Sequence, residues 1–384
     1  MNSRIAARFA LTMFASLFFA VAHTTAQTPT PASSLLVLEK DTNQLDIIDP
    51  STLKIIAKAP VGQDPHEVVA SADGKLAYIS NYGGGERSSL HMISVVDLVA
   101  QKALAPLDLG SLRGTHGLDF AGGELYFTAE ANKVIGRFDP ATQKVDWVMG
   151  TGQDRTHMIW VSPASDKIVT SNVSSATISI IESAALTTGG FGPPPAGPGA
   201  NRGGGAGRDQ GFGGPPPVGN QKSWKITNVQ VGRGSEGFDV SPDGKEIWTA
   251  NAQDNTVSVV NFSDKKVIQT VPISVQGANR LKFTLDGKLV LVSGLGMGGP
   301  ASAQAPATST PNLVVLDAAT RKEIKKLNLG GGSAGILMDP NGSRAFVASS
   351  GGNKVMVIDL TGLIVTGQIA PLGQPDGMAW ATRK

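Results

Sequence analysis

The stretch EGFDVSPDGKEIWTAN, residues 236–251, decides the fold, because near-copies of it recur along the chain. HEVVASADGKLAYISN, residues 66–81, keeps the same frame. The frame starts again at His116, His157, Asn279, Ala334 and, as a truncated copy, at Asp376. Successive starts lie 41 to 79 residues apart, and the shorter intervals cluster near 42 residues. A repeat of this length predicts an array of similar supersecondary units.

Each copy reads as four short β-strands, named a to d in chain order. Strand a alternates polar and apolar residues, as in 237–240, and a Ser-Pro-Asp-Gly or Ala-Asp-Gly turn follows it. Strand b is typified by 246–250, strand c by the β-branched run 256–260, and strand d by 266–271. Four strands in about 42 residues are typical of one propeller blade.

The two ends of the chain complement each other. Residues 376–380 form a strand a with nothing after it, whereas residues 34–39, 44–49 and 54–58 form strands b, c and d with no strand a before them. Joining them completes a seventh blade and leaves no open sheet edge. We therefore predict an all-β fold, a seven-bladed β-propeller over residues 34–381, whose last blade is closed by the C-terminal strand a with the N-terminal strands b, c and d.

Two insertions explain the long intervals between repeats. Residues 187–222 are dominated by Gly and Pro, which predicts a disordered insertion in a c–d turn. Residues 294–311 form a shorter insertion in a b–c loop. The repeat resumes in register after each, so neither is a linker between domains.

The first 26 residues resemble a signal peptide. Arg4 and Arg8 precede the apolar run 9–22, and small residues place the predicted cleavage near Ala26. The chain has no Cys, which excludes a lipid anchor and disulfides. No later apolar stretch is long enough to span a bilayer. We expect a periplasmic or secreted protein.

The charge balance argues against nucleic-acid binding. The chain has 33 Lys plus Arg against 31 Asp plus Glu, and without Arg4 and Arg8 both counts are 31. A neutral mature chain lacks the basic surplus of a nucleic-acid binder. We expect a monomer whose partner is a small anionic molecule or an unidentified protein.

Two motifs carry a resemblance to known families. Residues 241–251, Ser-Pro-Asp-Gly followed by a strand ending in Asn, and residues 355–359, a β-branched strand ending in Val-Ile-Asp, resemble the YVTN/YncE family of bacterial seven-bladed propellers. The single stretch Asn-Tyr-Gly-Gly-Gly at 81–85 is similar to a motif of the seven-bladed lactonase family. The first resemblance implies the fold, but related propellers include lactonases, lyases and binding proteins.

Blade geometry predicts a site at one mouth of the central channel. Because strands alternate in direction, the start of strand a, the d–a connection and the b–c loop share one face. The strand-a starts supply candidate metal ligands: His66, His116, His157 and Glu236. The d–a connections supply candidate anion-binding arginines: Arg113, Arg155 and Arg233. The ends of strand b supply candidate ligand-binding amides: Asn81, Asn172 and Asn251.

Several interpretations of this mouth stay open. Arginines suit a carboxylate or phosphate on a small anionic ligand. Imidazoles with a carboxylate suit a divalent metal, the only cofactor expected, in a metal-assisted hydrolase or lyase with His116 and His157 as catalytic groups. The polar residues can also be purely structural. A scaffold for protein or nucleic acid, using the 187–222 segment, is a further alternative.

Overall fold

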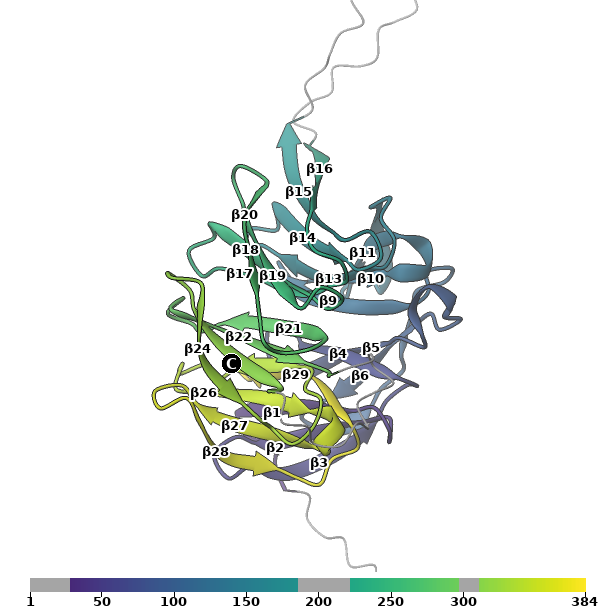
Figure 1. Ribbon diagram of the computed structural model, residues 1–384. Coiled ribbons are helices and arrows are strands. Elements are labelled where there is room, and N and C mark those ends of the chain that lie inside the picture. Colours follow the sequence, from purple (N-terminus) through teal and green to yellow (C-terminus); the bar gives the residue numbers. More distant parts are fainter. Residues whose placement is uncertain (1–27, 186–221, 297–310) are drawn as a thin grey trace, which may run out of the picture.

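The computed structural model describes residues 28–185, 222–296 and 311–384 as seven small antiparallel sheets arranged in a ring (Figure 1). Six sheets have four strands, and the seventh carries its outer strand in two pieces. We number the blades 1 to 6 from the frame that starts at His66, and blade 7 joins the termini. The predicted seven-bladed β-propeller is confirmed.

The first three internal repeats form blades 1 to 3. Blade 1 consists of β4 (Pro65–Ala70), β5 (Leu76–Asn81), β6 (Met92–Asp97), β7 (Lys102–Ala103) and β8 (Leu107–Asp108). Blade 2 consists of β9 (Thr115–Ala121), β10 (Glu124–Ala129), β11 (Val134–Asp139) and β12 (Lys144–Gly150). Blade 3 consists of β13 (Thr156–Val161), β14 (Lys167–Asn172), β15 (Thr177–Ala185) and β16 (Lys222–Gln230).

Blades 4 to 6 complete the internal repeats. Blade 4 consists of β17 (Ser235–Val240), β18 (Glu246–Asn251), β19 (Thr256–Asn261) and β20 (Lys266–Pro272). Blade 5 consists of β21 (Ala278–Phe283), β22 (Leu289–Gly294), β23 (Leu313–Asp317) and β24 (Lys322–Leu327). Blade 6 consists of β25 (Ile336–Met338), β26 (Arg344–Ser349), β27 (Lys354–Asp359) and β28 (Ile364–Ile369).

Blade 7 closes the ring with both ends of the chain, as predicted. Its strands, in order from the axis outward, are β29 (Pro375–Thr382), β1 (Ser33–Glu39), β2 (Gln44–Asp49) and β3 (Lys54–Pro60). The C-terminal strand β29 pairs antiparallel with β1, with Leu36 opposite Ala379 (Figure 1). In the part of the chain that the structure describes, single-turn 3₁₀ helices occur in three b–c loops: η1 (Gly85–Arg87), η2 (Glu130–Asn132) and η4 (Ser350–Gly352).

Apolar side chains pack between neighbouring blades. Trp248 on strand b of blade 4 is fully buried and meets Phe283 on strand a of blade 5, with ring centroids 5.4 Å apart. Tyr78 on strand b of blade 1 makes the corresponding contact with Phe120 on strand a of blade 2, with the two rings stacked. The hydrophobic core therefore lies between neighbouring blades, as in other repeat architectures.

Glycine at the second frame position lets the inner strands meet around the axis. A Cβ on Gly117 would lie 2.5 Å from the carbonyl oxygen of His157 in the next blade, and one on Gly237 would lie 2.6 Å from that of Asn279. These approaches leave no room for a side chain. Blades 1 and 5 carry Glu67 and Arg280 at this position instead, and both side chains enter the channel region.

The predicted insertions fall between described strands. In blade 3, β15 ends at Ala185 and β16 begins at Lys222, and in blade 5, β22 ends at Gly294 and β23 begins at Leu313. The disorder predicted for residues 187–222 stays a prediction, because residues 186–221 lie outside the described residues, as do residues 297–310 and the predicted leader. Within the described ranges, no helix is long and apolar enough to cross a bilayer.

Candidate functional site

All seven frame starts line one cavity of about 80 Å³ at the channel mouth. They are His66, His116, His157, Glu236, Asn279, Ala334 and Asp376. Hydroxyl groups on strand b hold several of them from the neighbouring blade: Thr128 donates to the carbonyl oxygen of His157, and Ser293 donates to that of Ala334. The repeat frame therefore converts seven distant positions into a single ring.

A second ring comes from the b–c loops. In four blades the first residue after strand b also lines the cavity: Lys40, Tyr82, Leu295 and Ser350. In blade 2 the equivalent residue is Glu130, which is fully buried and contacts His157 and Tyr82. The sequence analysis missed these residues. The sequence does contain a signal for three of them, because Tyr82, Leu295 and Ser350 each stand sixteen positions after their frame start.

His157 bridges two carboxylates. Its Nδ1 lies 2.5 Å from Glu130 Oε1, and its Nε2 lies 2.9 Å from Glu236 Oε2. Burial alone would lower the pKa of His157, but the charges of Glu236 and Glu130 outweigh burial and raise it. Burial opposes ionisation of Glu236 as well, yet His157 and Arg155 lower its pKa to about 2. His157 therefore lies between two acidic side chains that favour its protonated form.

His116 has the opposite character. Burial, together with the charge of His157, lowers the pKa of His116 well below its ordinary value. Its ring lies 3.6 Å from the ring of His157, centroid to centroid. Its Nδ1 is buried and has no hydrogen-bond partner among the described residues. His116 is therefore a neutral imidazole at the centre of the site with unused hydrogen-bonding capacity.

His66 completes the imidazole arc on blade 1. Its Nε2 lies 2.8 Å from Lys40 Nζ, and Lys40 also pairs with Asp376 at 3.3 Å. Burial, followed by the charge of Lys40, lowers the pKa of His66 to about 4. At neutral pH this ring is a neutral acceptor for the Lys40 ammonium.

Tyr82 brings the Asn-Tyr-Gly-Gly-Gly stretch into the site. Its hydroxyl donates to Glu130 Oε2 at 2.9 Å, and its ring packs against His66 and His116. A Cβ on Gly85 would lie 2.5 Å from both the Tyr82 hydroxyl and Glu130 Oε2, so glycine is needed there. Burial raises the pKa of Tyr82, which keeps the hydroxyl protonated.

Of the three candidate arginines, Arg155 is the one that lines the cavity. Its backbone has φ 52°, a left-handed conformation that is unfavourable for a side chain of this size. At the equivalent position, two residues before the frame start, blades 2, 4 and 5 have glycine with positive φ, whereas blades 1 and 7 have Asp64 and Gln374 with φ 53° and 50°. The left-handed turn is therefore a feature of the repeat, and in blade 3 it carries a guanidinium to the cavity.

Arg280 forms the floor of the cavity. Its guanidinium donates to Glu67 Oε1 at 2.8 Å and lies 4.0 Å from Glu236. Arg280 also lines a deeper cavity of about 350 Å³ on the other side of this ion pair. The Arg280–Glu67 pair therefore separates the mouth from the rest of the channel.

The structure does not bring the other two candidate arginines to the cavity. Arg113 is half-buried and donates to the carbonyl oxygen of Ser89, and Arg233 is exposed and pairs with Asp254 at 2.7 Å. Both stand three residues before a frame start, whereas Arg155 stands two before. A shift of one residue along the d–a connection therefore directs the side chain away from the central axis of the propeller.

The three candidate asparagines lie outside this cavity, inside the blades. Asn81 donates to Ser94 Oγ at 3.0 Å and Asn172 makes the equivalent bond to Ser179, whereas the Asn251 amide oxygen accepts from Ser258 Oγ at 2.9 Å. Ser94 in turn accepts from the backbone N–H of Gly62, in the connection from blade 7. These amides lock adjacent blades together.

The residues as arranged do not fit a metal ion. Both nitrogens of His157 face carboxylates, and His66 faces the Lys40 ammonium. Within residues 28–185, 222–296 and 311–384, no group of three or more His, Asp or Glu side chains is placed to hold a metal. Arg155 and Arg280 add positive charge at the same point. No step below therefore involves a metal.

No protein-family model matches this chain, and no curated protein matches it. Solved structures do match. A protein of unknown function from Desulfotomaculum acetoxidans has a TM-score of 0.65 and 11% identity, over 91% of this chain and 99% of that one. A candidate 6-phosphogluconolactonase from Bacteroides uniformis has a TM-score of 0.64 and 13% identity, over 91% and 100%.

A second candidate 6-phosphogluconolactonase, from Bacteroides fragilis, has a TM-score of 0.64 and 14% identity, over 92% of this chain and 99% of that one. Identities this low establish a shared fold and nothing further, since one propeller architecture supports many activities. The resemblance to the YVTN/YncE family stays a prediction. The chain is a seven-bladed β-propeller similar in fold to these proteins.

Proposed function

We propose that this chain is an exported propeller whose central cavity binds a small organic anion through a carboxylate group. The observation that carries the proposal is the state of Arg155. Among the described residues its guanidinium donates one hydrogen bond, to the Tyr82 hydroxyl at 3.4 Å. Its nearest carboxylate oxygens, on Glu130 and Glu236, are both 3.7 Å away. A guanidinium has five N–H donors, so most of them are available.

The other cations of the cavity are already engaged. Lys40 lies 3.3 Å from Asp376, Arg280 lies 2.8 Å from Glu67, and His157 lies 2.9 Å from Glu236. Each of these distances is shorter than those of Arg155. A carboxylate that enters the cavity would therefore find its bidentate partner in Arg155.

The size and lining of the cavity limit the ligand. About 80 Å³ holds a few non-hydrogen atoms, since one water occupies roughly 30 Å³ of liquid. A short hydroxy acid fits, as does the carboxylate end of a longer molecule. The neutral imidazole of His116 and the amide of Asn279 are uncharged hydrogen-bonding groups for a hydroxyl on the same ligand.

Calorimetric titration with acetate, glycolate and gluconate tests the proposal. We expect saturable binding of at least one of them to the mature chain. Arg155→Met should weaken it about 10- to 100-fold, the loss expected for a charge-assisted pair. Arg113→Met is the matched control, because Arg113 lies outside the cavity. Equal affinity in wild type and Arg155→Met, or no binding of any small carboxylate, would contradict the proposal.

A second function is favoured by the unpartnered nitrogen of His116. The neutral His116 is a candidate base for a water molecule, because its Nδ1 has no hydrogen-bond partner among the described residues. We propose that a lactone would be hydrolysed here: water loses a proton to His116 and adds to the carbonyl carbon. The ring C–O bond then breaks, the leaving oxygen takes the proton that His116 accepted, and a hydroxy acid forms.

Glucono-δ-lactone is a suitable substrate for testing the second function. Hydrolysis faster than the spontaneous reaction should be lost in His116→Asn and kept in Arg113→Met. If wild type shows no acceleration but still binds gluconate, the hydrolase proposal fails and the binding proposal stands.

A further inference from the structure

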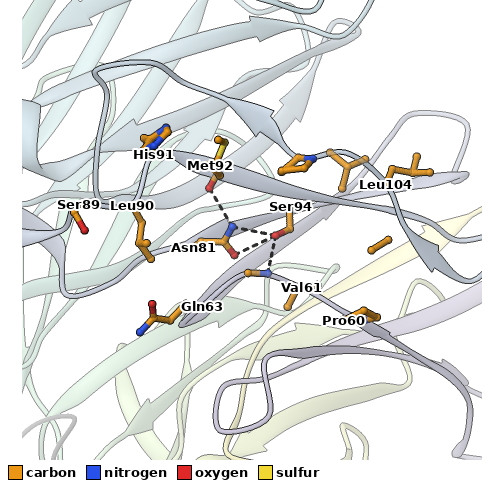
Figure 2. A pocket seen from close by; sticks show the side chains of 14 residues that line it. Pro60, Val61, Gln63, Asn81, Ser89, Leu90, His91, Met92, Ser94 and Leu104 are labelled. Atoms are coloured by element: carbon orange, nitrogen blue, oxygen red, sulfur yellow. Dashed lines mark hydrogen bonds between the residues drawn. The ribbon is translucent and has the colours of Figure 1, made fainter.

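A larger cavity lies between blades 7 and 1, away from the central site. Its volume is about 410 Å³. Pro60 and Val61, at the end of β3 and just after it, form one wall, and Leu90, Met92 and Leu104 of blade 1 form the other (Figure 2). Small-molecule pockets in proteins usually measure roughly 300–1,000 Å³, so this cavity has the size of a ligand site.

The cavity results from an interrupted outer strand. In six blades strand d is one continuous strand, whereas in blade 1 it is split into β7 and β8. The N–H of Leu104 still donates to the carbonyl oxygen of Val95 on β6. The chain then separates from β6 and pairs with it again at Leu107, which lies opposite Ile93. Pro106 lies between these points and has no N–H to add to the ladder. The bowed segment leaves space that a regular strand d would fill.

The polar groups in the walls of the cavity are hydrogen-bonded to one another. The Asn81 amide donates to Met92 O at 3.1 Å and to Ser94 Oγ at 3.0 Å, and Gly62 N–H donates to Ser94 Oγ at 2.8 Å (Figure 2). None of the lining residues is Asp, Glu, Lys or Arg. A charged ligand would lose its hydration here and gain no countercharge. The walls therefore favour an uncharged molecule.

One polar contact is available at the edge. His91 lines the cavity, and its Nδ1 lies 2.9 Å from Asp108 Oδ1. That contact leaves Nε2 for a ligand, and the exposed side chain of Gln63 lies on the opposite wall. A ligand with an apolar body and a single hydroxyl or carbonyl end would match both the walls and the edge.

We propose that the cavity between blades 7 and 1 binds a neutral, mostly apolar small molecule with one polar end. Burial of its apolar surface against Val61, Leu90 and Leu104 supplies the affinity. The site shares no lining residue with the central cavity, so it operates independently of the proposed anion binding.

The test uses N-phenyl-1-naphthylamine, a neutral apolar fluorophore. We expect saturable one-site binding to wild type and to Arg155→Met. Ala103→Trp should weaken it at least tenfold, because Ala103 is exposed on β7 and its enlarged side chain fills the cavity. Val148→Trp, at an exposed position on strand d of blade 2, is the matched control and should bind like wild type.

Two further readouts keep the test decisive. Leu104→Arg places a charge in the wall and should cause the same loss if Ala103→Trp fails to fold. The imidazole NMR signals of His91 should shift on binding, whereas those of His116 should not. Absence of saturable binding, equal binding in all variants, or unchanged His91 signals would each overturn the proposal.

Discussion

The rings of His116 and His157 lie 3.6 Å apart, centroid to centroid, with 31° between their planes. Two imidazoles this close cannot both carry a proton at low cost. The carboxylates of Glu236 and Glu130 place the positive charge on His157, and His116 stays neutral. The two imidazoles on adjacent blades therefore differ in charge.

Removal of His157 should destabilise the propeller strongly. His157→Ala removes the closest cation of the buried Glu130 and the partly buried Glu236 and leaves them Arg155 at 3.7 Å, and broken buried pairs cost about 3–5 kcal/mol. Urea unfolding measures this loss. Arg233→Ala, which breaks the exposed pair with Asp254, should cost less than about 1 kcal/mol. Similar values for the two variants would refute the proposed charge arrangement.

The titration of His66 sets one pH dependence. The pKa of His66 is lowered to about 4 by burial and Lys40. Between pH 4 and 6.5 the unfolded chain binds a proton on this residue and the folded chain does not. The free energy of unfolding should therefore rise with pH across this window. His66→Gln should reduce the slope, and an NMR titration should find His66 neutral at pH 6.

Asp46 should produce the opposite trend. It is buried in blade 7, and burial, followed by the neighbouring Glu39, raises its pKa to about 8. Lys58 lies 3.4 Å from Asp46 but contacts Glu39 more closely. Between pH 4 and 8 the folded chain keeps a proton that the unfolded chain has released, so stability contributed by Asp46 falls as pH rises.

Asp46→Asn provides the measurement. The variant should lose this decline, so its stability relative to wild type should increase from pH 5 to pH 8. Thermal unfolding at both values is sufficient. A constant difference between the two proteins across this range would show that Asp46 is ionised in the folded state.

The axis glycines predict a further stability difference. A Cβ on Gly237 would lie 2.6 Å from the carbonyl oxygen of Asn279, so Gly237→Ala should cost about 1–3 kcal/mol or more through overpacking. Gly150→Ala is the control, because nothing lies within 4 Å of its Cβ position. Its free energy of unfolding should change by less than about 1 kcal/mol.

The repeat frame was sufficient to predict the fold and the ring of frame starts. Equivalent positions in a ring must share one depth and one face, so His66, His116 and His157 converge wherever the blades do. Side-chain direction was harder to predict. Asn81 lies on the correct strand but points into its own blade, because strand b does not border the channel.

Loop conformation limited the prediction in the connections. Arg113 and Arg155 differ by one position relative to their frame starts, and only the position two residues before the start has the left-handed backbone that recurs in most blades. Lys40 and Glu130 come from b–c loops whose paths depend on neighbouring blades. Once the blades are aligned on the structure, their positions relative to the frame show that both residues belong to the second ring of the site.

Imidazole NMR on the mature chain tests the central claim most directly. Among its histidines, His66, His116 and His157 line the central cavity and His91 lines the other one. Titration with the best-binding small carboxylate should shift the signals of the first three and leave those of His91 unchanged. Arg155→Met should abolish the shifts at the same concentrations. A carboxylate that moves His91, or that moves none of the four, would contradict an anion site at the channel mouth.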